Sequence, residues 1–307
     1  MKLIFLSFLL IFSTSAFSQS ISGEISIGGE YNYWSPLDLA AVEVNTEGFQ
    51  VGFVELGFDL VGFSIPVLRY ETNFGGSYQD EIIMLQEGEG EFAKYENLIG
   101  ILDVSSFVVK YNKETYISDV SAINNFNYID RRGRVEQFVV GQQASFSTQF
   151  ESLFLGKDFG TTTGGVFYAT YKKPYFFTDN ELQDRSTLFF GEFKSFGIEG
   201  FGSASNEGLP FQLDYGFKFG LGDVDLGLVG AIDDTLNNGE RVGYFELSLL
   251  PRWTKAFGKS TAFNLGIEAV YRYFYKATAG GTTTLGEDRG FNSDLTVKIL
   301  ASVMYRF

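Results

Sequence analysis

Apolar and polar residues alternate with a period of two along most of the chain. In residues 21–33 one set of alternate positions is apolar: Ile21, Ile25, Ile27, Tyr31 and Tyr33. The positions between them are polar or charged: Ser22, Glu24, Ser26, Glu30 and Asn32. Residues 211–221 and 263–276 repeat the pattern. Because successive side chains of a β-strand point to opposite faces, each segment predicts a strand with one apolar and one polar face.

The same pattern predicts an all-β fold with about fourteen strands, and twelve is the alternative count. The predicted strands span residues 20–33, 47–60, 63–76, 93–102, 105–117, 140–156, 163–176, 186–194, 197–204, 209–220, 223–232, 241–254, 261–275 and 291–307. Residues 220–223 are interpreted as a tight hairpin turn between two of them. Most long polar connections alternate with short ones, which predicts that the long connections gather at one end of the sheet.

The lengths of these segments favour a transmembrane barrel over a soluble sandwich. Sandwich strands commonly have about five or six residues, whereas a tilted strand needs roughly nine to eleven residues to cross a bilayer. Many of the predicted strands reach that length. Inside lipid every backbone N–H and C=O group has to be paired within the protein, so the sheet has to close. The sequence therefore predicts a transmembrane antiparallel β-barrel, closed by pairing of its first and last strands.

The first residues predict export from the cytoplasm. Lys2 precedes an apolar run of about ten residues, and Ala16 and Ser18 lie at the spacing that signal peptidases recognise. The run is too short to cross a hydrocarbon core of roughly 30 Å as a helix. Residues 1–18 are therefore predicted to be a cleaved signal peptide, and residues 19–307 a single barrel domain. The chain contains no Cys, so no disulfide is expected to stabilise the exported domain.

The chain ends in LTVKILASVMYRF and keeps the alternation up to its last residue. Phe307, Tyr305, Val303, Ala301 and Ile299 share one face of this predicted strand. The ending resembles that of Gram-negative outer-membrane β-barrel proteins, whose last strand carries alternating apolar residues and an aromatic last residue. The resemblance is to the class as a whole. It implies a bacterial outer-membrane location, contact with outer-membrane lipid and lipopolysaccharide, and an assembly signal at Phe307, Tyr305 and Val303 for the barrel-assembly machinery.

Charged residues on the polar face are the main candidate functional residues, because that face lines the lumen of a barrel. By alternation the predicted lumen set is Arg69, Glu71, Lys110, Glu114, Glu192, Lys194, Asp214, Lys218, Glu246, Arg252, Glu268, Arg272, Asp294 and Lys298. Barrels of about eight strands are filled by side chains, whereas those of about 16 to 18 strands leave an aqueous channel. Inward Gly216 and Gly266 favour a pore for passive passage of small solutes, while inward Phe190 and Phe274 favour occlusion. A non-conducting structural or interaction barrel, or a subunit of an envelope assembly, is therefore the alternative function.

Two charged loops are candidate sites at the mouth of the barrel. Residues 78–96 contain six acidic residues, among them Glu87, Glu89 and Glu91, and a single Lys. A cleft lined with one sign of charge concentrates the opposite ion, so this loop predicts a weak cation preference, and an ordinary solvated acidic loop is the alternative. The other loop carries Arg131, Arg132 and Arg134, whose planar guanidinium groups suit phosphate or carboxylate groups, and an ordinary basic loop tip is the alternative. The net charge of −15 argues against nucleic acid as a partner.

Residues that support catalysis are scarce. The chain has no His, so it has no imidazole to act as a general base, and we do not expect an enzyme. The FGKST stretch at residues 257–261 lacks the first glycine of a phosphate loop and precedes a predicted strand. Asp223 and Asp225 lack the further oxygen ligands of a calcium loop and are interpreted as turn residues. Neither a cofactor nor a metal ion is expected.

Overall fold

The computed structural model describes residues 22–37, 48–60, 63–75, 90–121, 126–129, 132, 134–179, 184–205, 210–225, 239, 241–278, 281–284 and 293–307. Its β-strands are β1 (Ser22–Leu37), β2 (Phe49–Leu60), β3 (Phe63–Gly75), β4 (Gly90–Val104), β5 (Phe107–Ser121), β6 (Phe126–Ile129), β7 (Val135–Phe138), β8 (Gln143–Asp158), β9 (Thr162–Asp179), β10 (Asp184–Ser205), β11 (Phe211–Asp225), β12 (Arg241–Phe257), β13 (Thr261–Thr278), β14 (Gly281–Thr284) and β15 (Ser293–Arg306). Within these residues there is no helix with the length and apolar character needed to span a membrane. The predicted signal peptide lies outside the described residues.

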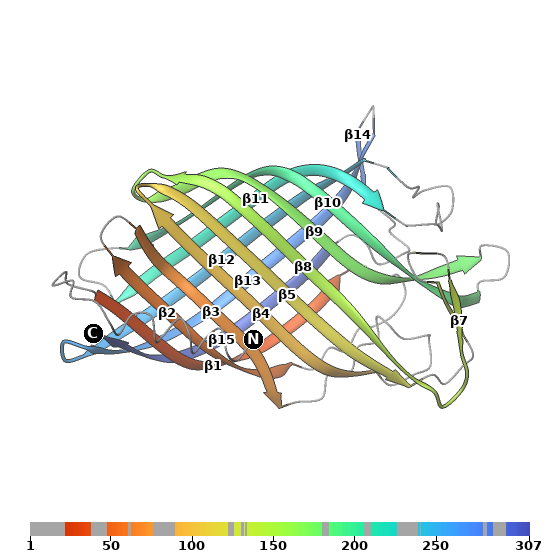
Figure 1. The fold of residues 1–307 in the computed structure, drawn as a ribbon, viewed down its shortest axis with the longest axis horizontal. Helices are drawn as coiled ribbons and strands as arrows, with labels where there is room; N and C mark the ends of the chain where they lie inside the picture. Colours follow the sequence, from red (N-terminus) through yellow and green to blue (C-terminus); the bar gives the residue numbers. More distant parts are fainter. Residues whose placement is uncertain are drawn as a thin grey trace, which may run out of the picture.

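Twelve of the strands form a closed antiparallel barrel (Figure 1). Each barrel strand pairs with the next one along the chain, and β15 pairs with both β13 and β1. At this seam Gly23 and Phe307 exchange two backbone hydrogen bonds, with N···O distances of 3.0 and 3.1 Å. The predicted all-β barrel, closed by its first and last strands, is confirmed, and the number of barrel strands is twelve.

Two of the predicted turns are in fact parts of continuous strands. Predicted strands 186–194 and 197–204 are both in β10, and β11 continues through the predicted hairpin at residues 220–223. Neither Gly220 nor Gly222 has a positive φ, and a Cβ atom at Gly222 would collide with the backbone carbonyl of Lys194 in β10. These glycines therefore permit the close approach of β10 and β11. Asp223 and Asp225 both belong to β11, so their interpretation as turn residues is wrong.

The two ends of the barrel differ in their connections. At one end, which we call the turn end, the links between strands span residues 61–62, 105–106, 159–161, 206–210 and 258–260. Most links at the other end, the loop end, are longer, and the three remaining strands lie there. β6 pairs in parallel with β10, β7 pairs with β6, and β14 pairs with β13. Figure 1 shows β7 and β14 at the end of the barrel opposite to the C-terminus.

The outer wall of the barrel is apolar. Along β15, Val303 and Tyr305 are 53% and 51% exposed, whereas Ser302 and Met304 beside them are 5% and 8% exposed. Large apolar side chains are exposed on other strands as well, among them Ile27, Leu155, Phe196, Ile198, Phe219, Leu221, Ile267 and Ile299. An apolar wall around a sheet without edges suits a transmembrane barrel, because lipid covers the wall and the sheet satisfies its own backbone groups.

Candidate functional site

The lumen contains two clusters of ion pairs, and Glu71 is the centre of the first. Its carboxylate accepts hydrogen bonds from Arg69 Nε at 2.6 Å and from Lys298 Nζ at 2.9 Å. The Tyr95 hydroxyl donates a third hydrogen bond to Glu71 at 2.8 Å. Arg69 also reaches Glu30 across the lumen face, with an N–O distance of 2.6 Å. The Glu71 side chain is only 1% exposed, so its charge is balanced inside the barrel by these partners rather than by solvent.

Arg272 is the centre of the second cluster. Its guanidinium group lies 2.8 Å from Glu114 and 3.0 Å from Glu246. Lys218 is also 2.8 Å from Glu246. Two tyrosines complete the cluster, since the Tyr116 hydroxyl donates to Glu114 and the Tyr244 hydroxyl to Glu246, each at 2.6 Å.

The pair formed by Arg272 and Glu114 joins opposite walls of the barrel. Glu114 is on β5 and Arg272 on β13. In the order of the barrel, β8 to β12 lie between these strands on one side, and β15 and β1 to β4 lie between them on the other. The two side chains are 3% and 5% exposed. This ion pair therefore spans the lumen with both of its side chains buried.

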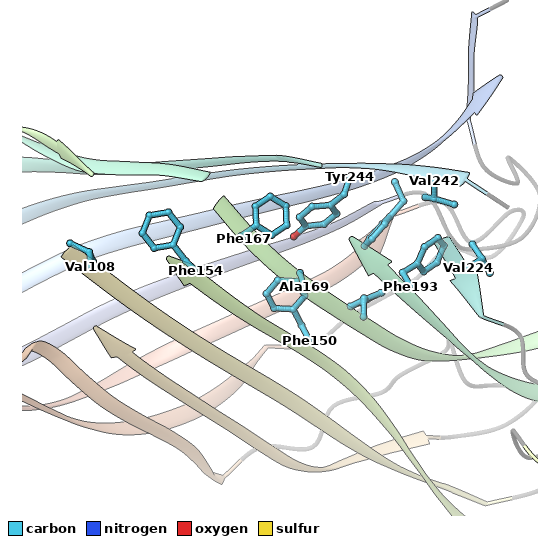
Figure 2. Packing of buried hydrophobic residues seen from close by; sticks show 11 residues of the cluster. Val108, Phe150, Phe154, Phe167, Ala169, Phe193, Val224, Val242 and Tyr244 are labelled. Atoms are coloured by element: carbon cyan, nitrogen blue, oxygen red, sulfur yellow. The ribbon is translucent and has the colours of Figure 1, made fainter. Parts of the chain in front are cut away.

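Aromatic rings fill the part of the lumen beside Arg272. The buried cluster contains Val108, Phe150, Phe154, Phe167, Ala169, Tyr171, Phe193, Val224, Val242, Tyr244 and Phe274 (Figure 2). The Phe274 ring lies 4.8 Å from that of Phe193 and 5.2 Å from that of Tyr171, measured between centroids. The Arg272 guanidinium lies 4.4 Å from the centroid of the Phe150 ring. Phe150 therefore makes a cation–π contact with Arg272, the arginine of the ion pair that spans the lumen.

The inward glycines do not leave open space where the sequence suggested it. A Cβ atom at Gly216 would lie 2.5 Å from Ser248 Oγ. A Cβ atom at Gly266 would lie 3.0 Å from Leu250 Cδ1 and 3.4 Å from Leu300 Cδ1. Neighbouring side chains occupy the room that the missing side chains release, so these two glycines do not argue for a pore.

Most of the other predicted lumen residues form ion pairs as well. Lys110 lies 2.8 Å from Glu199, and Arg252 lies 2.9 Å from Asp214. Glu268 is 3.9 Å from Lys298 and extends the Glu71 cluster to β13. Asp294 is opposite Arg272 in the register of β13 and β15, and its side chain lies outside the described part of the structure.

Glu192 and Lys194 are placed on the outer face, and their assignment to the lumen is wrong. Between them in β10 is Phe193, which belongs to the buried lumen cluster. Phe196 and Ile198, at the same parity as Lys194, are 60% and 56% exposed on the outer wall. The predicted break at residues 195–196 allowed the inward positions before and after it to differ in parity. In the continuous β10 every second residue faces the same side, so Glu192 and Lys194 share the face of Phe196 and Ile198.

The residues predicted at the mouth are only partly described. Glu87, Glu89 and Arg131 lie outside the described residues, and of Glu91 only its place in β4 is described. Arg132 and Arg134 are exposed near β7. At the turn end Phe307 is 56% exposed on the outer wall, beside the seam that it closes.

Sequence reasoning missed the tyrosines and several carboxylates of the lumen. Glu30 was assigned to a polar face but not to a site, and Glu199 was not singled out. The buried Tyr95, Tyr116 and Tyr244 were missed because the predicted lumen set contains charged residues only. Tyr116 and Tyr244 each have an acidic residue two positions away, Glu114 and Glu246, and this spacing is the signal that would have found them. Tyr95 has no such neighbour. In the part of the chain that the structure describes, no group of three or more acidic side chains is arranged to hold a metal ion.

No protein-family model matches the chain, and no curated protein matches it. Solved structures do match. The beta domain of the Bordetella autotransporter Brka matches with a TM-score of 0.38 and 14% identity, over 94% of this chain and 100% of that chain. The chain is similar to solved outer-membrane β-barrels. The CymD monoaromatic hydrocarbon channel has a TM-score of 0.36 and 9% identity, over 94% of this chain and 88% of that one. The outer membrane protease OmpT from Escherichia coli has a TM-score of 0.32 and 9% identity, over 96% and 99%. At these identities the similarity to outer-membrane barrels concerns the fold alone.

Proposed function

We propose that this outer-membrane barrel is closed to solutes in its resting state and serves the envelope as a structural or interaction barrel. The contact between Arg272 and Glu114 carries the proposal, because it joins opposite walls at 2.8 Å with both side chains buried. A solute crossing the lumen would have to separate these groups and pass the aromatic cluster beside them. Separating them leaves two charges in a site of low dielectric, which is strongly unfavourable.

The remaining features of the proposal follow from the chain's ends and charges. The protein is exported with a cleaved signal peptide and assembled by the barrel-assembly machinery through Phe307. Its loops contact lipopolysaccharide on the cell surface. We propose no enzymatic activity, because the chain has no His and the buried lumen carboxylates of Glu71, Glu114 and Glu246 are engaged by Lys, Arg and Tyr side chains.

A passive pore with a weak cation preference is the second candidate function. Asn32 is fully buried in the lumen, and neither atom of its amide group has a hydrogen-bond partner among the described residues. The Thr296 hydroxyl on the neighbouring strand has no such partner either. Buried polar atoms of this kind are usually satisfied by water. A hydrated seam beside Lys298 would favour conduction if the ion pairs opened.

Conductance across planar lipid bilayers separates the two functions. We expect the folded wild-type barrel to pass no steady current. A double variant, Arg272→Ala with Glu114→Ala, removes both halves of the bridge without leaving an unpaired charge and is expected to admit current. The matched control is Arg306→Ala with Glu24→Ala, because this pair is exposed at the turn end and does not cross the lumen.

Folding of each variant is checked by its heat-modifiable mobility on a gel. A steady wild-type current equal to that of the lumen double variant would refute the closed barrel and support the pore. A firm anion preference in that current would direct attention to Arg69, Arg252 and Arg272 rather than to the acidic loop.

A further inference from the structure

Charged residues lie in the middle of the outer face of β5 and β8. Lys113 is six residues after Phe107, where β5 leaves the turn end, and Glu151 is seven residues before Asp158, where β8 reaches it. Lys113 and Glu151 are opposite each other in the register of these strands. They share the outer face, because Phe150 beside Glu151 belongs to the buried lumen cluster.

β11 and β12 carry no charge in the corresponding part of their outer face. On β11 the outer positions from Phe211 to Leu221 are all apolar or aromatic, and the first charged one is Asp223, twelve residues after the start of the strand. On β12 no outer position between Lys255 and Arg241 is charged, and these two residues are fourteen positions apart. The apolar part of the outer wall is therefore much taller at β11 and β12 than at β5 and β8.

This difference in height is a large part of the thickness of a bilayer. A strand rises about 3.3 Å per residue and is tilted by about 40° in a transmembrane barrel, so each residue adds roughly 2.5 Å of height. By this measure the uncharged stretch of β12 is about 35 Å tall, whereas the stretch of β8 from Lys157 to Glu151 is about 15 Å tall. The apolar band of an outer-membrane barrel is about 25 Å tall. The apolar wall at β8, formed by the exposed Leu153 and Leu155, is therefore shorter than a bilayer of ordinary thickness requires.

The polar surface beyond Glu151 is continuous up to the loop end. Gln149 and Ser147 follow Glu151 on the outer face of β8. On β4, the other neighbour of β5, Glu96 and Lys94 are exposed and form an ion pair at 2.8 Å. Water and lipid headgroups reach such a surface from the loop end. An isolated polar patch with apolar wall above it would instead suit a protein partner within the membrane.

A rigid tilt of the barrel does not account for the short wall. Tilting moves both limits of the apolar wall in the same direction on one side of the barrel and leaves its height unchanged. On β8 the wall is limited from both ends, since Lys157 is exposed one residue from the turn end of the strand. The bilayer itself therefore has to adapt to this side of the barrel.

We propose that the bilayer is thinner against β5 and β8 than against β11 and β12, with lipid headgroups of the loop-end leaflet at the level of Lys113 and Glu151. A wall shorter than the hydrocarbon core is accommodated by thinning of the bilayer. The Tyr111 hydroxyl donates a hydrogen bond to Glu151 at 2.9 Å, which holds the carboxylate at this level, and Lys113 offers an ammonium group to a lipid phosphate. The inference goes beyond the proposed function, because it concerns the outer wall and does not depend on whether the lumen conducts.

The membrane depth of single labelled cysteines tests the thinning, since the chain has no Cys of its own. Thr115→Cys and Phe219→Cys are matched, because each position is eight residues from the turn end on the outer face of its strand, β5 or β11. Each variant carries a fluorophore and is refolded in phosphatidylcholine vesicles that contain lipids with a nitroxide quencher. We expect a headgroup nitroxide to quench the label at position 115 several-fold more than a mid-chain nitroxide does. The label at position 219 is expected to show the opposite order.

Two control positions on β8 define the limits of the short wall. The label of Leu155→Cys is expected to be quenched by the mid-chain nitroxide, because Leu155 lies between the charges that limit the wall. The label of Lys157→Cys is expected to be quenched by the headgroup nitroxide from the turn end. Heat-modifiable mobility confirms that each labelled variant is a folded barrel.

Removal of the two charges tests whether they set the level of the headgroups. Lys113→Leu with Glu151→Leu extends the apolar wall, and in the Thr115→Cys background we expect the quenching ratio to shift towards that of Phe219→Cys. The matched control is Arg306→Leu with Glu24→Leu, which removes an exposed ion pair at the turn end and is expected to leave the ratio unchanged. An unchanged ratio in the first double variant would refute the role of Lys113 and Glu151.

Three further results would overturn the thinning. The labels at positions 115 and 219 would lie at the same depth, or the label at position 157 would be quenched mainly by the mid-chain nitroxide, which would indicate a tilted barrel. In the third, the label at position 115 would be protected from lipid nitroxides and from a water-soluble quencher alike, which would identify protein rather than lipid as the cover of this surface.

Discussion

Removal of the charge at Arg272 is expected to lower the free energy of unfolding by about 3 kcal/mol. Breaking a buried ion pair from one side costs roughly 3–5 kcal/mol, because the remaining charge stays buried. In Arg272→Met the Glu114 carboxylate, 3% exposed, keeps only the Tyr116 hydroxyl among these contacts. Glu246 is less affected, since it keeps Lys218 at 2.8 Å. One of the two carboxylates thus stays paired, which places the effect at the lower end of the range.

A double-mutant cycle isolates the contact across the lumen. Glu114→Gln removes the other charge, and the combination with Arg272→Met leaves two neutral side chains of similar size. Replacing both partners by neutral groups is commonly close to neutral, so the double variant is expected to be more stable than the sum of the single effects predicts.

Urea unfolding of the refolded barrel in lipid vesicles, followed by tryptophan fluorescence, measures these free energies. Arg306→Met is the matched control, because its exposed contact with Glu24 at 3.4 Å should contribute only about 0–1 kcal/mol. If Arg272→Met costs no more than this control, or if the two changes across the lumen are additive, the reasoning from the buried bridge is refuted.

Three further predictions concern the wall, the last residue and the topology. Ile299→Arg puts a charge on the outer wall, where Ile299 is 56% exposed, and is expected to cost about 2–4 kcal/mol by the same unfolding assay if the residue lies near the bilayer midplane; a change near zero would place it outside the lipid. Phe307→Asp is expected to reduce the folded fraction in outer membranes more than it reduces secretion, and normal barrel levels would contradict an assembly signal. If the acidic loop faces the outside of the cell, Gly88→Cys is expected to react with an impermeant thiol reagent on intact cells. Labelling only after rupture of the outer membrane would show that this loop faces the periplasm.

The outer wall was predictable from the sequence because lipid acts on every outward position alike. In β15 the alternation of Ile299, Val303 and Tyr305 with Lys298 and Ser302 appears unchanged as alternate exposed and buried side chains. Closure was predictable for the same reason, since an unpaired strand edge in lipid leaves backbone groups unsatisfied. Because lipid surrounds the whole outer wall, the wall and the closure can both be predicted from short stretches of the sequence.

The strand count depended on glycines whose role is not local. Gly220 and Gly222 read as turn residues when only their neighbours in the chain are considered. Their actual constraint is the backbone of β10, which approaches Gly222 too closely for a side chain. The predicted break of β10 at residues 195–196 moved Glu192 to the wrong face, because a one-residue change of parity exchanges the two faces of a strand.

Whether the lumen is open depends on whether side chains from opposite walls meet across it. The alternation of polar and apolar residues carries no information about that distance. It identified Glu114 and Arg272 as inward residues, but these residues are 158 positions apart in the chain and lie on opposite walls. Twelve strands place those walls close enough for one arginine and one glutamate to meet, whereas in barrels of about 16 to 18 strands charges of the same kind line a channel. The aromatic residues act in the same direction, since Phe274 on β13 packs against Tyr171 on β9. The described interior is therefore packed like the core of a small barrel, and this packing supports the proposal of a closed lumen.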